Sequence, residues 1–213
     1  MQNKETRNQI IALINKEVVP AIGCTEPMAV ALATARATEA LGSRPAKIKA
    51  LLSANILKNA MGVGIPGTGM IGLPIAIALG ALIGKSEYQL EVLRDLTLET
   101  LEEGKTYINE KRIDISLKDD ITEKLYVEII CTSADGRSSS AIIAGSHTNF
   151  VYVCSPDGVV LDKQHTISSE SDDNDIRLSM KMVHEFATTA PLDEIRFILK
   201  TKVYNMNAAR KAI

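Results

Sequence analysis

The sequence has few cysteines and no strong excess of charge of either sign. Its three cysteines, Cys24, Cys131 and Cys154, are an odd number and form no CxxC pair, so neither a disulfide framework nor a zinc knuckle is indicated. The net charge is −2 and no basic stripe alternates with aromatic residues, so nothing points to nucleic acid. No HExxH motif, Ser/His/Asp order, paired-carboxylate motif or internal repeat is present.

The sequence also lacks long hydrophobic runs. The N-terminal stretch "MQNKETRNQII" is polar and has no apolar core of a signal peptide. The most apolar stretch, "IGLPIAIALGALIG" (residues 71–84), covers about half to two-thirds of a bilayer and is interrupted by glycine and proline. We interpret it as a buried core helix. These features predict a cytoplasmic protein with neither a membrane nor a nucleic-acid partner.

What remains is an ordinary globular composition of 213 residues, 46% hydrophobic and 23% charged. The patterning predicts an α+β fold: a helical part over 1–110, a β-rich antiparallel meander over 111–167 and a helical part over 176–211. We expect one α+β domain over 1–213. Because the sequence ends at "NAARKAI" within a helical pattern, we also expect it to be the N-terminal part of a longer enzyme.

Individual elements follow from periodicity and from glycine and proline. We expect one strand in the helical part, over 46–53, and turns at "ADG" and "PDG" in the β-rich part. The stretch "GVGIPGTGMIG" is expected to be a loop without regular structure, and "SSESDDND" (168–175) a charged linker. The expected helices cover residues 3–18, 28–41 (closed by Gly42), 54–61, 73–84, 87–103, 176–188 and 193–209.

The first candidate site is "GCTEP". If Thr25 is the N-cap, Pro27 falls in the first helical turn, where its missing N–H has no cost. Cys24 then lies beside unpaired N–H groups that favour its thiolate. A thiolate can bind a metal or an iron–sulfur cluster, or act as a nucleophile. A semi-buried structural cysteine is the alternative interpretation.

The second candidate is the polar trio Asn55, Lys58 and Asn59, which are spaced i, i+3, i+4 and share one helical face. The glycines that follow can form a nest of backbone N–H groups for a carboxylate or phosphate. No GKS or GKT ends this stretch, so it is not a P-loop. A glycine-rich helix–helix crossing is the alternative.

The third candidate is "GSHTN", a polar interruption between two strand-like runs. His147 is either a general base or an ordinary turn residue. We interpret His165 and His184 as surface residues, and Cys131 and Cys154 as packing residues within strands.

Three segments, "PAIGCTEP", "NILKNAMGVGIPGTGMIGLPIA" and "AGSHTN", occur in this order. Together they resemble the N-terminal part of the L-cysteine desulfidase family, which is related to the catalytic alpha portion of bacterial iron–sulfur L-serine dehydratases. The resemblance covers residues 18–153 and is weak from residue 176 onward.

The resemblance implies a lyase with an oxygen-sensitive 4Fe-4S cluster and no pyridoxal phosphate, which converts L-cysteine to pyruvate, ammonia and hydrogen sulfide. It implies that Cys24 is a cluster ligand and that His147 is the catalytic acid or base, with Lys58 as an alternative base if burial lowers its pKa. The substrate-binding residues that it implies are Asn55, Asn59, Gly67, Thr68, Gly69, Thr148 and Asn149.

Three cysteines hold the cluster in such a family, and only Cys24 lies in a matching motif. We therefore expect the other ligands in a C-terminal half or second subunit, with a homodimer as the other expected assembly. L-serine dehydratase activity, a non-catalytic small-carboxylate-binding or assembly domain, and a thiol nucleophile at Cys24 are the alternative functions.

Overall fold

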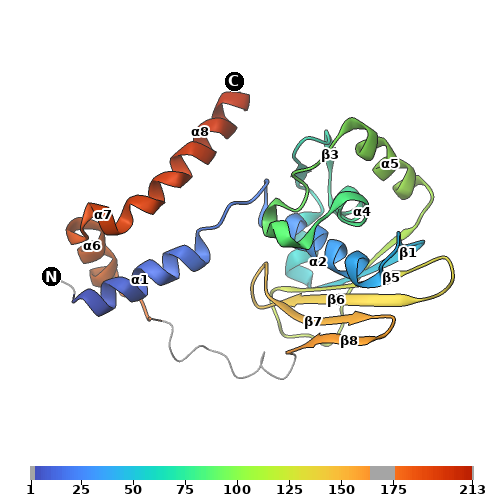
Figure 1. Cartoon of the computed structure of the whole chain (residues 1–213), viewed down its shortest axis with the longest axis horizontal. Helices are drawn as coiled ribbons and strands as arrows, with labels where there is room; N and C mark the ends of the chain where they lie inside the picture. Colours follow the sequence, from blue (N-terminus) through green and yellow to red (C-terminus); the bar gives the residue numbers. More distant parts are fainter. Residues whose placement is uncertain (1–2, 164–175, 213) are drawn as a thin grey trace. The chain divides into compact units, whose positions relative to one another are not determined.

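The computed structural model describes residues 3–163 and 176–212. The chain divides into two compact units: Ala21–Ser169, and a second that combines Met1–Pro20 with Glu170–Ile213. The single domain expected over 1–213 did not separate these two units (Figure 1). The expected linker at 168–175 and His165 lie outside the described residues. The predicted α+β class is confirmed, with helices at both ends of the chain and a mostly antiparallel sheet.

The larger unit is built on a six-stranded sheet in the order β4-β1-β5-β6-β7-β8. Strands β5 to β8 form an antiparallel meander, as expected, and Figure 1 shows β6, β7 and β8 side by side. The expected meander also included β4, and there it is wrong, because β4 pairs parallel with β1 at the edge of the sheet. The helical half is not separate from this sheet, because its strand β1 pairs parallel with β4 and antiparallel with β5. The strands are β1 (Lys47–Leu52), β4 (Ile113–Leu117), β5 (Tyr126–Thr132), β6 (Ser138–Ala144), β7 (Phe150–Ser155) and β8 (Gly158–Asp162).

Helix α2 (Thr25–Leu41) forms the centre of the core. It packs against β5, β6 and β7 on one side and against α4 (Leu73–Ile83) on the other, and α4 in turn packs against α5 (Leu98–Asn109). Nearly every α2 side chain from Pro27 to Ala37 is buried. The apolar stretch at 71–84 is thus a core helix, as predicted, and Gly42 closes α2 in the left-handed conformation.

Close packing between α2 and α4 depends on glycine. A Cβ on Gly80 would lie 2.5 Å from the carbonyl oxygen of Ala31, and one on Gly84 would lie 2.7 Å from Cβ of Ala35. A glycine-mediated helix crossing therefore occurs at Gly80 and Gly84, within and directly after α4, and not in the glycine-dense stretch before α4 for which it was considered.

The prediction of a single amphipathic helix over 87–103 is wrong. A 3-10 segment, η1 (Ser86–Glu91), is interrupted at Gln89, whose φ is 52°. Helix α5 then starts anew, because Thr97 and Thr100 form a reciprocal capping box. Leu90 and Leu93 are buried, but Leu98 is 82% exposed. The leucine spacing that suggested one continuous face comes from two differently oriented segments.

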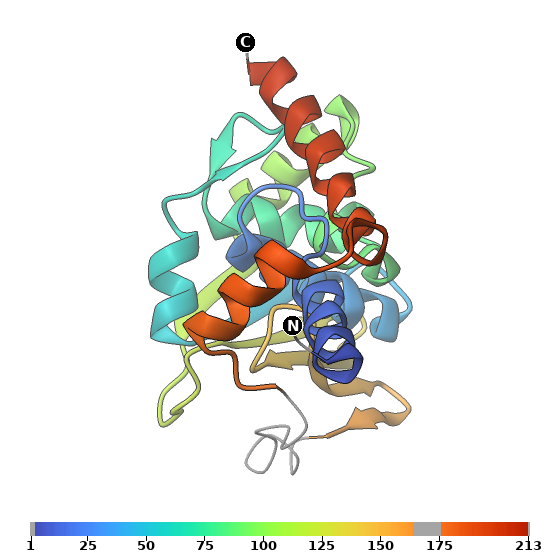
Figure 2. The ribbon, with the colours of Figure 1, turned by 90° about the vertical axis from the view of Figure 1, so that its left-hand side faces the viewer.

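The smaller unit is helical. Arg7 on α1 donates from Nε to Glu194 on α7 at 3.0 Å, which ties the N-terminal helix to the C-terminal ones. His184 is exposed on α6, as predicted. Both expected C-terminal helices are present, although Pro191 is followed by a short turn of helix and a 3-10 segment before α8 (Figure 2). The elements are α1 (Lys4–Glu17), α6 (Met180–Thr189), α7 (Leu192–Ile195), η3 (Arg196–Leu199) and α8 (Lys200–Ala212).

Within the described parts of the chain, none of the helices is both long and apolar enough to span a bilayer.

Candidate functional site

Cys24 lies at the start of α2, with its side chain exposed to solvent. Gly23 precedes it with φ of 80°, a left-handed turn that directs the chain into the helix. The predicted cap at Thr25 is wrong: Cys24 has the extended N-cap conformation, and Thr25 is the first helical residue. The Thr25 hydroxyl instead donates to Oε2 of Glu26 at 3.3 Å. Pro27 lies in the first turn, as expected.

The glycine-dense stretch is more regular than expected. Strands β2 (Gly64–Ile65) and β3 (Met70–Ile71) pair as a short hairpin around a turn at residues 66–69. Thr68 is buried in this turn, where its hydroxyl donates to the Ile65 carbonyl at 2.7 Å and accepts from the Met70 N–H at 3.0 Å. The Thr68 side chain therefore holds the hairpin, and the two turn glycines, Gly67 and Gly69, are exposed with positive φ.

The hairpin packs against the residues before Cys24. A Cβ on Gly23 would lie 2.8 Å from Cγ of Pro66, so glycine is needed for this close approach. Residues 23 and 66 are distant in sequence, and their contact places Cys24 beside the hairpin turn. Two of the three segments singled out in the sequence are thereby brought together.

Helix α3 (Ala54–Ala60) adds the polar trio. Ile56 and Ala60 are buried, whereas Asn55, Lys58 and Asn59 are not, and lie on the other face, as their spacing predicted. Asn59 donates from Nδ2 to Oε1 of Glu26 at 3.3 Å. This hydrogen bond joins α3 directly to the first turn of α2, two residues after Cys24.

Glu26 was not among the predicted site residues. Its carboxylate is half-buried and accepts from both Thr25 and Asn59, so it lies between the start of α2 and α3. The signal was in the sequence, because Glu26 is part of "GCTEP". However, a carboxylate in a first helical turn is ordinary, since it complements the helix dipole. Only its long-range hydrogen bond to Asn59 distinguishes Glu26 from an ordinary carboxylate in a first helical turn.

His147 lies in the β6–β7 loop. Gly145 donates its N–H to the Leu125 carbonyl at 3.2 Å, and the Asn149 amide donates to the Ala144 carbonyl at 3.0 Å, so Asn149 stabilises its own loop. His147 and Thr148 are half-buried. The loop shares an end of the sheet with the start of α3, because Ser53 donates its N–H to the Tyr126 carbonyl.

No hydrogen bond in the described part of the chain joins His147 to Cys24, Glu26 or the trio on α3. The third candidate segment is thus placed at the same sheet end as α3 but is not bonded to the other two.

The remaining cysteines lie elsewhere. Cys131 is fully buried on β5, and burial raises the pKa of its thiol to about 12, so it is a packing residue, as predicted. Cys154 is half-buried on β7. Among residues 3–163 and 176–212, no group of three or more His, Cys, Asp or Glu side chains is placed to hold a metal ion. Among the described cysteines, Cys24 has the one exposed thiol that could bind a cluster, since Cys131 is buried and Cys154 is half-buried.

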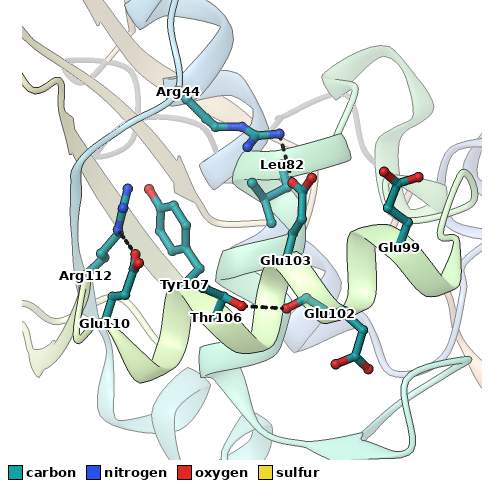
Figure 3. A pocket seen from close by; sticks show the side chains of 9 residues that line it. All are labelled: Arg44, Leu82, Glu99, Glu102, Glu103, Thr106, Tyr107, Glu110 and Arg112. Atoms are coloured by element: carbon teal, nitrogen blue, oxygen red, sulfur yellow. Dashed lines mark hydrogen bonds and ion pairs between the residues drawn. The ribbon is translucent and has the colours of Figure 1, made fainter.

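A separate open cavity of about 510 Å³ lies along α5 (Figure 3). Its acidic side chains are largely ion-paired: Glu103 lies 2.9 Å from Arg44, and Glu110 lies 2.5 Å from Arg112. Because these charges are compensated locally, we assign the cavity no ligand. Its lining residues are Arg44, Leu82, Glu99, Glu102, Glu103, Thr106, Tyr107, Glu110 and Arg112.

Comparison with known proteins finds relatives named UPF0597 proteins. A UPF0597 protein of Bacteroides fragilis is 66% identical over 206 residues, which are 97% of this chain and 48% of the relative. UPF0597 proteins of Parabacteroides distasonis and Porphyromonas gingivalis are 56% and 49% identical over 211 residues each, which are 97% and 96% of this chain and 48% of either relative. No protein-family model matches the chain, and no solved structure matches it.

These names overturn the expected family. None of these relatives is named a cysteine desulfidase or a serine dehydratase, so the assignment to the L-cysteine desulfidase family is wrong. The chain is similar instead to UPF0597 proteins, and it spans about half the length of the curated relatives that it matches.

Proposed function

We propose that this chain carries the substrate-binding part of a β-eliminating lyase for a small amino acid, with L-cysteine as the substrate. The observation that supports the proposal is the assembly of Cys24, the hairpin turn and the α3 trio through the Gly23–Pro66 contact and the Asn59–Glu26 bond. One accessible thiol, one carboxylate, amides and an amine thereby share one region. These are the groups that binding and deprotonating a small zwitterion require.

Charge decides how the substrate would be held. The exposed turn at Gly67 and Gly69 offers backbone N–H groups, and the Lys58 ammonium and Asn55 amide lie on the neighbouring α3 face. Together they suit the substrate carboxylate. The Glu26 carboxylate suits the substrate ammonium, while Asn59 keeps Glu26 in position through their hydrogen bond. Thr68 contributes by keeping the turn in shape.

The reaction needs a base and a leaving-group path. In our proposal His147 removes the α-proton, because the exposed Lys58 ammonium holds the substrate carboxylate and has no free electron pair. The Cβ–S bond breaks and the leaving hydrosulfide takes up a proton, so hydrogen sulfide leaves as 2-aminoacrylate forms. The 2-aminoacrylate tautomerises to an imine, and water converts it to pyruvate and ammonia. The overall balance is L-cysteine plus water giving pyruvate, ammonia and hydrogen sulfide, without an oxidant or pyridoxal phosphate.

Cys24 fits one position of a 4Fe-4S cluster, because its thiol is exposed to solvent at the start of α2 and cysteine is the usual ligand of such clusters. A bound cluster with an open iron would supply a Lewis acid for the elimination. The other ligands would come from outside the described residues, on a further part of the protein, a second subunit or a second copy in a homodimer. We place the reaction in the cytoplasm, where thiols stay reduced.

The test uses the full-length Bacteroides fragilis relative, purified without oxygen and supplied with iron and sulfide. We expect sulfide, pyruvate and ammonia in equal amounts from L-cysteine. Alanine at the positions aligned with Glu26 and Lys58 should lower kcat/KM at least tenfold. The matched control is alanine at the position aligned with Lys49, an exposed lysine on β1. Absence of sulfide release from iron-replete protein would overturn the proposal. Pyruvate from L-serine but not L-cysteine would change the substrate to serine.

A further inference from the structure

Helix α8 carries an unpartnered apolar stripe. Leu199, directly before its first residue, and Val203 and Met206 are spaced i, i+4, i+7, so they lie on one face of the helix. Their exposed fractions are 61%, 60% and 41%. Figures 1 and 2 both show α8 extending away from α1 and α6 of its own unit. Contiguous exposed apolar side chains of this size indicate an interaction surface.

The helical unit buries little by itself. Among its described residues, Ile10 and Phe186 are the buried hydrophobic side chains. On α6, Met180 is 84% exposed and Val183 is 44% exposed. A unit with so small a core gains too little from apolar burial to offset the chain entropy of ordering its helices. Its helices therefore need a further surface to pack against.

The relatives indicate what that surface is. The region matched to this chain is 48% of the length of the Bacteroides fragilis protein, so that protein has about as much sequence again outside the match. We propose that the stripe of Leu199, Val203 and Met206 is the docking surface for a polypeptide equivalent to that unmatched part, present on the same chain or as a second subunit. This inference does not depend on the lyase activity.

The rim of the stripe specifies the chemistry of the partner. Residues 200–210 contain Lys200, Lys202 and Arg210, which are all exposed, and no acidic residue. Stable protein–protein interfaces combine an apolar centre with a polar rim whose charges complement those of the partner. The docking partner should therefore present an apolar patch edged by aspartate or glutamate.

Cysteine labelling tests this docking directly. Val203→Cys is made in this chain, and a cysteine is placed at the aligned position of the full-length Bacteroides fragilis relative. The rate of maleimide labelling at that peptide is followed by mass spectrometry, which separates it from the peptides of the native cysteines. We expect labelling at least tenfold slower in the full-length relative than in this chain. Ala208→Cys, on the opposite side of α8 from the stripe and exposed, is the matched control and should label at similar rates in both.

Other occupants give different results. Equal rates at position 203 in both proteins would overturn the proposal. Slow labelling already in this chain would also overturn it. In that case a dimer by mass photometry would identify a second copy as the occupant, and a monomer would identify another part of the same chain.

A stability comparison gives a second readout. Lysine at both positions aligned with Leu199 and Val203 should lower the Tm of the full-length relative more than the same pair lowers the Tm of this chain. Lysine at the positions of Asn205 and Ala208, which lie away from the stripe, adds the same charge and should leave both Tm values nearly unchanged. If the lysine pair at positions 199 and 203 lowered the Tm of both proteins equally, docking at this face would be contradicted.

Discussion

The Asn59 amide donates to the Glu26 carboxylate at 3.3 Å across 33 residues of sequence. The bond connects α3 to the first turn of α2, where Cys24 is the N-cap. Together with the contact of Gly23 with Pro66, it makes one region from two separate sequence segments. Every function proposed for this region depends on that assembly.

The Gly23–Pro66 contact predicts a large cost for Gly23→Ala. The new Cβ would lie 2.8 Å from Cγ of Pro66, and alanine is strained at φ of 80°. We expect the free energy of unfolding to fall by about 2–4 kcal/mol, measured by urea denaturation. Gly69→Ala, at φ of 65° with no atom within 4 Å, should cost only about 1–2 kcal/mol.

The clash itself is tested by a double-mutant cycle. Pro66→Gly should recover part of the stability lost in Gly23→Ala, because it removes the atoms that the new methyl meets. Strictly additive losses would show that the two segments do not touch in solution.

Gly80→Ala tests the α2–α4 crossing. The methyl would lie 2.5 Å from the Ala31 carbonyl oxygen, which is backbone within a buried helix. We expect a loss of about 1–3 kcal/mol by urea denaturation, even though alanine is the better helix former. Gly62→Ala, which has open space around it, is the control and should be neutral or slightly stabilising. If Gly80→Ala were as stable as the control, the helices would be further apart than described.

Much of the fold could be predicted from the sequence, because local signals dominate it. Gly42 closes α2 as glycine closes many helices, and the alternating runs of β5 to β8 form a meander. The helix predicted over 87–103 is wrong because leucine spacing does not reveal the non-helical φ of 52° at Gln89.

The candidate site was predictable in part. The shared face of Asn55, Lys58 and Asn59 followed from helical spacing. The role of Glu26 did not, because it rests on a contact 33 residues away that no local pattern encodes. The insertion of β1 between β4 and β5 is likewise a long-range pairing.

Cys24 and Cys131 should differ sharply in their reactivity toward alkylating reagents. Burial raises the pKa of Cys131 to about 12, so at pH 8 only about one part in 10⁴ of it is thiolate, whereas Cys24 is exposed. With iodoacetamide, native protein and no iron, we expect Cys24 to react at least 100-fold faster than Cys131 by mass spectrometry. Raising the pH toward 12 should reduce the difference between the alkylation rates of Cys24 and Cys131. In denaturant, where both thiols are exposed, the two rates should become similar. Comparable native rates would contradict the burial of Cys131.

A small carboxylate should bind without a cluster. We expect L-cysteine, L-serine or pyruvate to raise the Tm of this chain, with about 1.4 kcal/mol of stabilisation at ten times Kd. Lys58→Ala and Asn55→Ala should weaken this effect, and Cys24→Ala should leave it intact. Ligand stabilisation that vanishes in Cys24→Ala would instead place the thiol in direct contact with the ligand.

The central claim is that Cys24 is a cluster ligand beside the substrate site. Its most direct test is iron content, measured on the anaerobically reconstituted Bacteroides fragilis relative with serine at the position aligned with Cys24. Serine at the position aligned with Cys154 is the matched control. We predict close to four iron atoms per chain in the control, as a 4Fe-4S cluster requires, and a loss of most of the iron in the Cys24 variant. Equal iron content in the two variants, or none in the unmodified protein, would contradict it.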